Sequence, residues 1–140
     1  MERSSGAAPP LSSGGSGDAE NGQALSVQIE PVGTSASVIS LRGELDLSTI
    51  PRVEKQLLEQ LRAKAGVIVD LTGVSFIDSS GIRLLIRAFR STDDAGTLHT
   101  VIAEGSQVER VFRLAGIDRA LRLFMERAPA LEALNGAASG

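Results

Sequence analysis

One short segment, Val67-Ile68-Val69-Asp70-Leu71, constrains the fold of this chain more than any other. A brief apolar run bounded by turn signals is typical of a strand that is buried on both faces. Strands of this kind lie inside a sheet that helices cover on both sides. We therefore expect an α/β domain in which residues 67–71 form the central strand.

Two earlier segments have the alternating pattern of half-buried strands. Apolar residues alternate with polar ones in residues 25–29, and residues 37–41 follow a similar pattern with apolar Val38, Ile39 and Leu41. Gly33 lies between the two segments and suits a tight turn. These features predict a pair of antiparallel strands.

Three segments have apolar residues at the three- and four-residue intervals of a helix. The first covers residues 49–64, with Ser48 or Thr49 as a possible N-cap, Pro51 in its first turn and Gly66 after its end. The second covers residues 79–91, and its predicted buried stripe is Ile82, Leu85, Ile86 and Phe89. The third follows a capping box made of Ser106 and Glu109, with the stripe Val108, Val111, Phe112 and Ala115.

The remaining elements are shorter. A strand is predicted over residues 97–102 after a turn at 93–96, and another near residues 121–124. A last helix covers about residues 129–134. Because strands alternate with helices after the antiparallel pair, the chain should form a mixed sheet of four or five strands with about four helices.

The chain divides into a tail and a single domain. Residues 1–22 are rich in Gly, Ser, Ala and Pro and contain no aromatic or β-branched residue. Such a segment buries too little apolar area to offset its ordering entropy, so we expect it to be disordered. Residues 23–137 then form one domain of ordinary size.

Composition excludes several functions. The chain has no Cys, so it has no disulfides or thiolate metal sites. Its net charge of −3, with no Trp or Tyr, argues against nucleic-acid binding. No membrane-length apolar run or secretory signal occurs, so we expect a cytoplasmic protein that does not bind membranes.

Neither a cofactor nor a metal ion is expected. The glycines at Gly14 and Gly15 lie in the tail, without the strand and helix that a phosphate-binding loop requires. Asp93 and Asp94 show no metal-ligand spacing, and the chain has a single His. A solvated turn is the simpler account of the two acids.

The segment Asp78-Ser79-Ser80-Gly81 is the main candidate site. Asp78 is placed to cap the helix, and Ser79 then lies in the first turn, where backbone N–H groups are unpaired. A phosphate on Ser79 would add about −1.5 to −2 charges at one surface point. Gly81 would leave the turn open to a phosphate or another backbone. Capping alone explains Asp-Ser-Ser equally well, and Gly81 could serve only to relieve crowding.

The same helix carries Arg83, Arg87 and Arg90 at helical spacing, on the side away from the predicted apolar stripe. A basic stripe is commonly just a solvated face. Beside an exposed serine, however, it could bind an acidic patch on a partner.

Three motifs together resemble the STAS domain family, specifically the bacterial anti-sigma factor antagonists. They are residues 41–46 (Leu-Arg-Gly-Glu-Leu-Asp), residues 67–71 and residues 74–82 (Val-Ser-Phe-Ile-Asp-Ser-Ser-Gly-Ile). The likeness extends from about Leu25 to Leu134 and includes residues 110–117. The Asp-Ser-Ser-Gly element is the specific part of the pattern.

The resemblance implies a partner-switching mechanism. In such systems an anti-sigma factor that is also a serine kinase holds a sigma factor inactive, and the unphosphorylated antagonist binds that kinase. Phosphorylation of the first motif serine, here Ser79, weakens binding, and a PP2C-type phosphatase reverses it. Asp78 would neighbour that serine, and Asp46 would lie on the adjoining loop. The family often has Leu-Gly where this chain has Ile82-Arg83.

On this basis the protein is not an enzyme, is a monomer when free, and presents one partner-binding surface. The expected contact residues are Asp46, Asp78, Ser79, Ser80, Gly81, Arg83 and Arg87. The main alternative is a STAS adaptor that works without phosphorylation in another signalling, stress-sensing or transport complex. A hydrolase with Ser79 or Ser80 as nucleophile would need the single His99 as base, and the chain lacks the Gly-x-Ser-x-Gly elbow.

Overall fold

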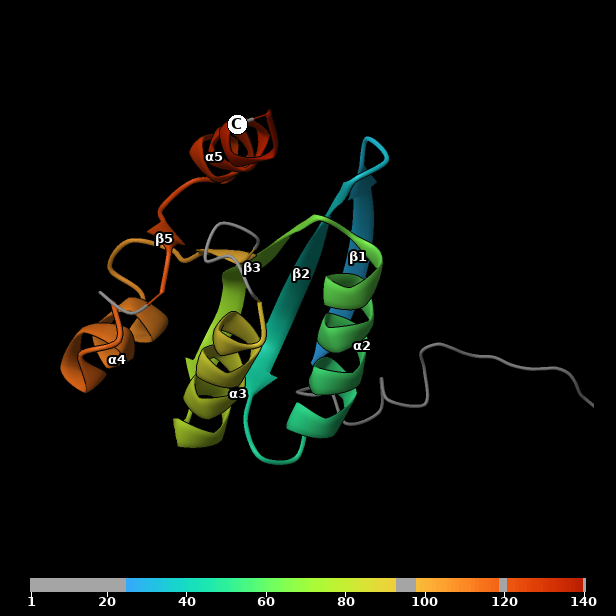
Figure 1. Ribbon diagram of the computed structural model, residues 1–140. Helices are drawn as coiled ribbons and strands as arrows, with labels where there is room; N and C mark the ends of the chain where they lie inside the picture. Colours follow the sequence, from blue (N-terminus) through green and yellow to red (C-terminus); the bar gives the residue numbers. More distant parts are fainter. Residues whose placement is uncertain (1–24, 93–97, 119–120, 140) are drawn as a thin grey trace, which may run out of the picture.

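The computed structural model describes residues 25–92, 98–118 and 121–139. The tail predicted for residues 1–22 and the turn at 93–96, with Asp93 and Asp94, lie outside the described residues. Within the described part, the chain forms one mixed sheet of five strands and four helices (Figure 1). This confirms the predicted α/β class.

The strands lie in the sheet in the order in which they occur in the sequence. The first pair is antiparallel and every later pair is parallel, which confirms the predicted arrangement. The elements in chain order are β1 Ser26–Val32, β2 Ala36–Leu45, α2 Ile50–Ala63, β3 Gly66–Ile77, α3 Ser79–Arg90, β4 Leu98–Val101, α4 Gln107–Ala115, β5 Leu123–Phe124 and α5 Arg127–Ser139.

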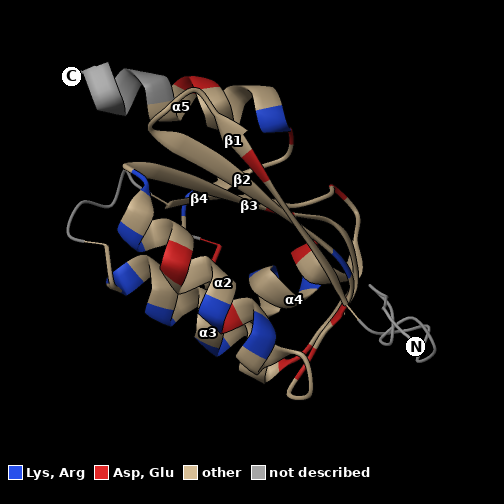
Figure 2. Cartoon of the chain, turned by 90° about the vertical axis from the view of Figure 1, so that its right-hand side faces the viewer, with Lys and Arg blue, Asp and Glu red and all other residues tan. Residues whose placement is uncertain are grey.

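The helices cover both faces of the sheet unequally (Figures 1 and 2). Side chains of α2, α3 and α4 share the larger apolar core, whereas α5 packs on the opposite face in a smaller core. Strand β3 contributes to both, with Val67, Val69 and Leu71 in the larger core and Ile68 in the smaller one. The predicted central, doubly buried strand is therefore confirmed.

Strands β2 and β3 are longer than the sequence pattern predicts. Strand β3 extends beyond the predicted residues 67–71, because it continues to Ile77 and pairs with the end of β2, up to Leu45. Two register shifts interrupt this pairing. Each shift breaks the two-residue alternation of side chains, so the extension is hard to detect by periodicity.

The helix ends differ in detail from the expectations. Thr49 is the N-cap of α2, but its side chain makes no capping bond; its Oγ1 donates to the Glu44 carbonyl instead. Gly66 does not end α2, since it is the first residue of β3. At α4, the Ser106 hydroxyl accepts from the Glu109 N–H at 3.1 Å, as a capping box requires.

The buried stripe of α3 is rotated relative to the prediction. Leu84, Leu85 and Ala88 are buried, whereas the expected Ile82, Ile86 and Phe89 pack against the core only partly. Helix α3 lies beside α2 on the same face of the sheet (Figure 1). Both neighbours, the sheet and α2, take up apolar surface, so the apolar side of α3 is wider than a single stripe.

A charged cluster fastens α5 to three strands. Arg127, the first residue of α5, donates to Asp70 on β3 at 2.7 and 3.2 Å, to Ser40 on β2 at 3.0 Å and to Glu30 on β1 at 3.1 Å. Burial of Asp70 would raise its pKa, but hydrogen bonds from Thr72 and the Arg127 guanidinium outweigh it and lower the pKa. The same contact raises the pKa of Arg127.

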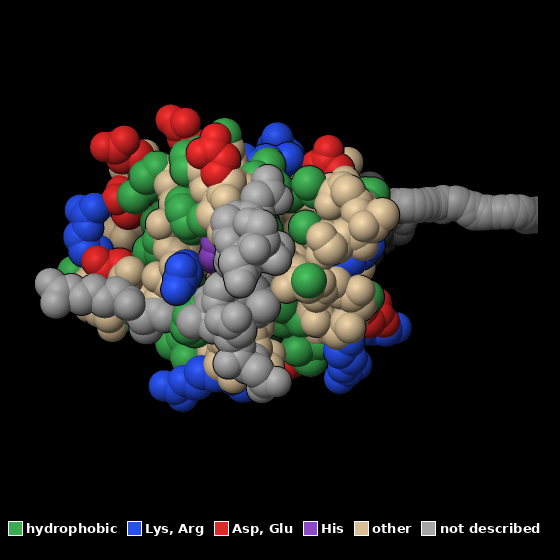
Figure 3. Space-filling model, turned by 45° about the horizontal axis from the view of Figure 1, so that its top comes forward, with side chains coloured by type: hydrophobic (Ala, Val, Ile, Leu, Met, Phe, Trp, Pro, Cys, Tyr) green, Lys and Arg blue, Asp and Glu red, His purple; other side chains and the backbone are tan. Residues whose placement is uncertain are grey.

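His99 lies on the face that α5 covers and is fully buried. Its Nδ1 donates to the Ala130 carbonyl of α5 at 3.2 Å, and its ring centroid is 5.0 Å from that of Phe124. In the space-filling view of this side, little of the purple histidine is visible between its neighbours (Figure 3). Among the described residues, its Nε2 has no hydrogen-bond partner. The neutral imidazole is therefore the form that this site accommodates.

No helix in the described part of the chain is long and apolar enough to cross a membrane.

The buried histidine predicts a loss of stability in mild acid. Burial lowers the pKa of His99 below 6.5, and the nearby Arg122 adds to this, although the Ala130 carbonyl opposes it. The unfolded chain therefore binds a proton at a higher pH than the folded chain. We expect the free energy of unfolding to fall as the pH drops through about 6.5, and to level off below the lower pKa of the folded state. Urea unfolding at pH 7.5 and 5.5 measures this.

The matched control is His99→Leu. Because His99 is the single histidine of the chain, this variant should show a much smaller change between the two pH values. An equal loss of stability in both proteins would contradict the assignment.

Candidate functional site

The candidate serine lies where β3 meets α3. Asp78 separates the two elements, and its N–H donates to the Leu45 carbonyl at the end of β2, at 3.2 Å. Its Oδ1 accepts from the N–H groups of Ser80 and Gly81 at 2.9 and 3.2 Å. Asp78 is thus the N-cap and Ser79 begins the helix, as predicted.

The Asp78 carboxylate is stabilised in its charged form. Its partial burial would raise the pKa, but hydrogen bonds from the Ser80 hydroxyl and from the N–H groups of Gly81, Ser80 and Leu47 together lower the pKa. A negative charge therefore stays at the start of α3 at neutral pH.

The two serines of the motif have opposite environments. Ser80 is buried and its hydroxyl donates to the Asp78 Oδ1 at 2.5 Å. Ser79 is exposed, and within the described residues its hydroxyl makes no hydrogen bond. Only Ser79 therefore offers a free hydroxyl at the surface.

Gly81 does not leave the first turn open, so that expectation is wrong. The residue is buried, and a Cβ built on it would lie 2.7 Å from Ile77 Cγ1 and 3.1 Å from Leu45 Cγ. Glycine here lets α3 approach the ends of β2 and β3, which is the crowding-relief alternative. Gly81 packs toward the core, and its contact with a partner stays a prediction.

The loop that follows β2 adjoins the site, as predicted for Asp46. Asp46 Oδ1 accepts from the Ser48 N–H and hydroxyl at 3.0 and 2.7 Å, which fixes the loop. Between them, Leu47 is 73% exposed, and near the end of β3, Phe76 is 41% exposed. The sequence pattern did not predict that these two apolar residues are exposed. One lies in a loop and the other near the end of a strand, outside any periodic pattern, so periodicity cannot indicate their exposure.

The arginines of the predicted basic stripe on α3 differ in whether they form ion pairs. Arg83, Arg87 and Arg90 are all exposed. The blue segments of α3 in Figure 2 mark the positions of its arginines along the helix. Arg87 pairs with Glu54 of α2 at 3.0 Å. Arg83, one turn nearer to Ser79, makes no ion pair or side-chain hydrogen bond in the described part of the chain. Arg87 is thus paired whereas Arg83 is free, and partner binding by either residue stays a prediction.

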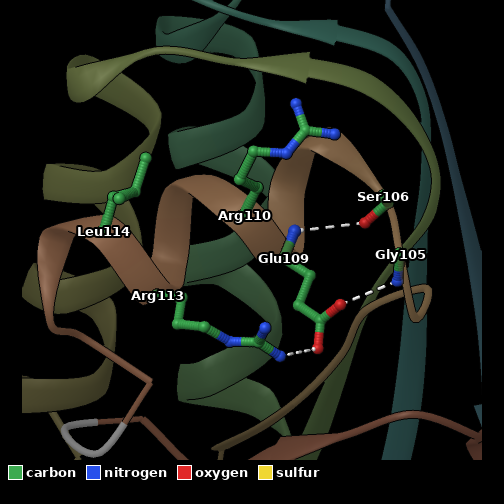
Figure 4. Close-up of a pocket in the computed structure, with 6 residues that line it drawn as sticks. All are labelled: Gly105, Ser106, Glu109, Arg110, Arg113 and Leu114. Carbon is green, nitrogen blue, oxygen red and sulfur yellow. Dashed lines mark hydrogen bonds and ion pairs between the residues drawn. The ribbon is translucent and has the colours of Figure 1, made fainter.

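Helix α4 is attached beside the site. Gln107 in its first turn accepts from the Ile77 N–H at 3.1 Å. Further along α4, Figure 4 shows a surface hollow in which Glu109 accepts from the Gly105 N–H and pairs with Arg113, while Arg110 and Leu114 point to the other side of the helix. The hollow does not include Ser79.

The structure also separates His99 from the motif serines. His99 contacts Ala130 and Phe124 on the α5 face, whereas Ser79 and Ser80 begin α3, which packs on the opposite face. The polar group bound to Ser80 is Asp78. The arrangement of serine and base that a hydrolase requires is therefore absent from these residues.

Comparison with known proteins gives the family. The model of the STAS domain matches residues 27–130. The chain belongs to the STAS domain family. This match includes every strand except the first residue of β1, together with the whole candidate site.

Named relatives of this STAS protein include regulators of two bacterial sigma factors. The anti-sigma-B factor antagonist of Listeria monocytogenes is 30% identical over 66% of this chain and 82% of its own length. The anti-sigma-F factor antagonist RsfB of Mycobacterium tuberculosis is 30% identical over 71% of this chain and 82% of its own length.

Solved structures agree with the fold. An anti-sigma factor antagonist from Mycobacterium paratuberculosis superposes with a TM-score of 0.73 at 23% identity, covering 81% of this chain and 96% of the other. The Bacillus cell fate determinant SpoIIAA in its phosphorylated form gives a TM-score of 0.55 at 25% identity, covering 80% and 99%. The STAS protein therefore has the same architecture as these regulators.

Replacing Gly81 tests the packing beneath the motif. Although Ala favours helices over Gly, its Cβ would meet Ile77 at 2.7 Å. We expect Gly81→Ala to lower the free energy of unfolding by about 1–3 kcal/mol, as overpacking does. Ser79→Ala, at an exposed position, is the control and should change it by less than about 0.5 kcal/mol. A more stable Gly81→Ala protein would show that the contact relaxes freely.

Removing the cap tests Asp78. Asp78→Ala leaves the N–H groups of Ser80 and Gly81 without their acceptor, which should cost about 1 kcal/mol at pH 7. Asp78→Asn keeps an acceptor and should cost less. Because the pKa of Asp78 is lowered on folding, this contribution is present above the unfolded pKa and is lost as the pH falls through the folded pKa. Chemical denaturation at pH 7 and pH 3 would measure both effects.

Proposed function

We propose that this STAS protein is an anti-sigma factor antagonist whose binding surface is centred on Ser79 and whose activity ends when Ser79 is phosphorylated. The observation that carries the proposal is the contrast between the two motif serines. Ser80 is buried and bonded to the cap, while Ser79 is exposed and unbonded at the start of a helix. The named relatives support the general role.

The surroundings of Ser79 have the character of a protein interface. Leu47 and Phe76 expose apolar area near the ends of β2 and β3. Removing such area from water is favourable by about 25 cal/mol per Å². Asp46 on the same loop as Leu47, and Arg83 one turn into α3, add charges of both signs. Apolar residues inside a charged margin are the common pattern of protein interfaces.

A phosphate on Ser79 would oppose binding at this surface. It adds about −1.5 to −2 charges where a partner must exclude water. Leaving an unpaired charge in an interface costs several kcal/mol, and about 2.7 kcal/mol already weakens binding a hundredfold. The switch therefore needs no change of fold.

The proposed partners are an anti-sigma factor that is also a serine kinase and a PP2C-type phosphatase. The chain itself is the substrate of both and performs no catalysis, and we place this exchange in the cytoplasm. The alternative, an adaptor that binds without phosphorylation, uses the same surface but leaves Ser79 unmodified.

Modification is tested by intact mass after incubation with ATP and purified anti-sigma factor kinases. We expect one added phosphate on wild type and on Ser80→Ala, and none on Ser79→Ala, because of the two motif serines only Ser79 has a free, exposed hydroxyl. Binding of a kinase without any added phosphate would favour the adaptor.

Binding is tested by calorimetry with the same kinases. We expect Ser79→Ala to retain affinity, and Ser79→Asp and Leu47→Asp each to lose at least about tenfold, which is about 1.4 kcal/mol. Leu114→Asp is the matched control, since Leu114 is 83% exposed at the far end of α4. Equal losses at Leu47 and Leu114 would contradict a surface centred on Ser79.

A further inference from the structure

Arg83 is the basic side chain placed nearest to Ser79 along α3. The two residues are four positions apart in the helix, a spacing that puts side chains side by side on one face. Both are exposed. Within the described residues Arg83 has no partner, whereas the next arginine, Arg87, is held by Glu54. A free guanidinium therefore lies one turn from the free hydroxyl.

Two of the first N–H groups of α3 are not available to a phosphate on Ser79. A helix N-terminus usually binds anions through its first unpaired N–H groups. Here the N–H groups of Ser80 and Gly81 are already bonded to the Asp78 carboxylate. That carboxylate keeps its charge, and it would repel a second anion attached to the neighbouring residue. A phosphate at this position needs a cation from elsewhere.

We propose that Arg83 binds the phosphate of phosphorylated Ser79 within the same helix. This inference rests on the proposed modification of Ser79. The planar guanidinium can donate two parallel hydrogen bonds to phosphate oxygens, which suits a phosphoserine one turn away. The contact offsets the repulsion from Asp78 and favours the doubly charged phosphate. Arg83 is thus a positioning residue of the switch.

Other arginines are less suited to the role. Arg87 is eight residues from Ser79 and is engaged with Glu54. Arg110 belongs to α4, which is joined to the end of β3 through Gln107 and Ile77. Arg110 is therefore the next basic residue to test, and it belongs to a different helix.

The test is a ³¹P NMR titration of protein that carries phosphoserine at position 79, introduced by nonsense suppression so that no kinase is needed. Free phosphoserine has a second pKa of about 6. We expect the phosphate pKa of Arg83→Gln to be higher than that of wild type by about 0.2–0.4 units, the difference that one helical ion pair produces. Arg83→Lys should recover part of the shift.

Arg87→Gln is the matched control and should leave the phosphate pKa unchanged. In 6 M urea, where the helix is lost, wild type and Arg83→Gln should titrate alike. Equal values for the two folded proteins would overturn the proposal, and so would a shift caused by Arg110→Gln in place of Arg83→Gln. Because the phosphoserine is incorporated during translation, failure of a kinase to modify Ser79 would count against the proposed function and leave this result standing.

Discussion

The burial of β3 on both faces is the constraint on which the rest of the structure depends. Its alternate side chains enter two separate cores. A register shift of one residue would therefore place Asp70 in the larger core and turn Val67 and Val69 toward α5. The Arg127 guanidinium at Asp70 fixes the same register from the α5 side. With β3 held in this way, its last residues pair with β2 up to Leu45 and Ile77, and that pairing determines where α3 begins.

At this position, the four residues of the motif have different structural roles. Asp78 joins the end of β2 to the start of α3, Ser80 and Gly81 turn inward, and Ser79 is left outside. Three of the motif residues therefore build the helix start, and one is free for chemistry. A modification confined to the outer residue can change the surface while the packing beneath it stays intact.

The sequence predicted the elements better than their ends. The apolar run of β3, the helical spacing of α2 and α3 and the Asp78 cap were all apparent, because each depends on local periodicity or a local hydrogen bond. The extension of β3 to Ile77 was not, since pairing across register shifts with β2 determines it. The inward role of Gly81 and the exposure of Leu47 depend on tertiary neighbours, which no single-chain pattern contains.

The charged groups that attach α5 and the charged groups around Ser79 lie on different sides of the sheet. The α5 face holds Asp70 with Arg127, and His99 held neutral by burial, so protons affect the packing of that helix. The start of α3 holds Asp78 and Arg83 next to Ser79, and there an added phosphate meets one fixed anion and one free cation. Since the elements involved do not overlap, a change of charge at Ser79 would act on the proposed binding surface without weakening the attachment of α5. A surface switch on a stable scaffold requires this separation.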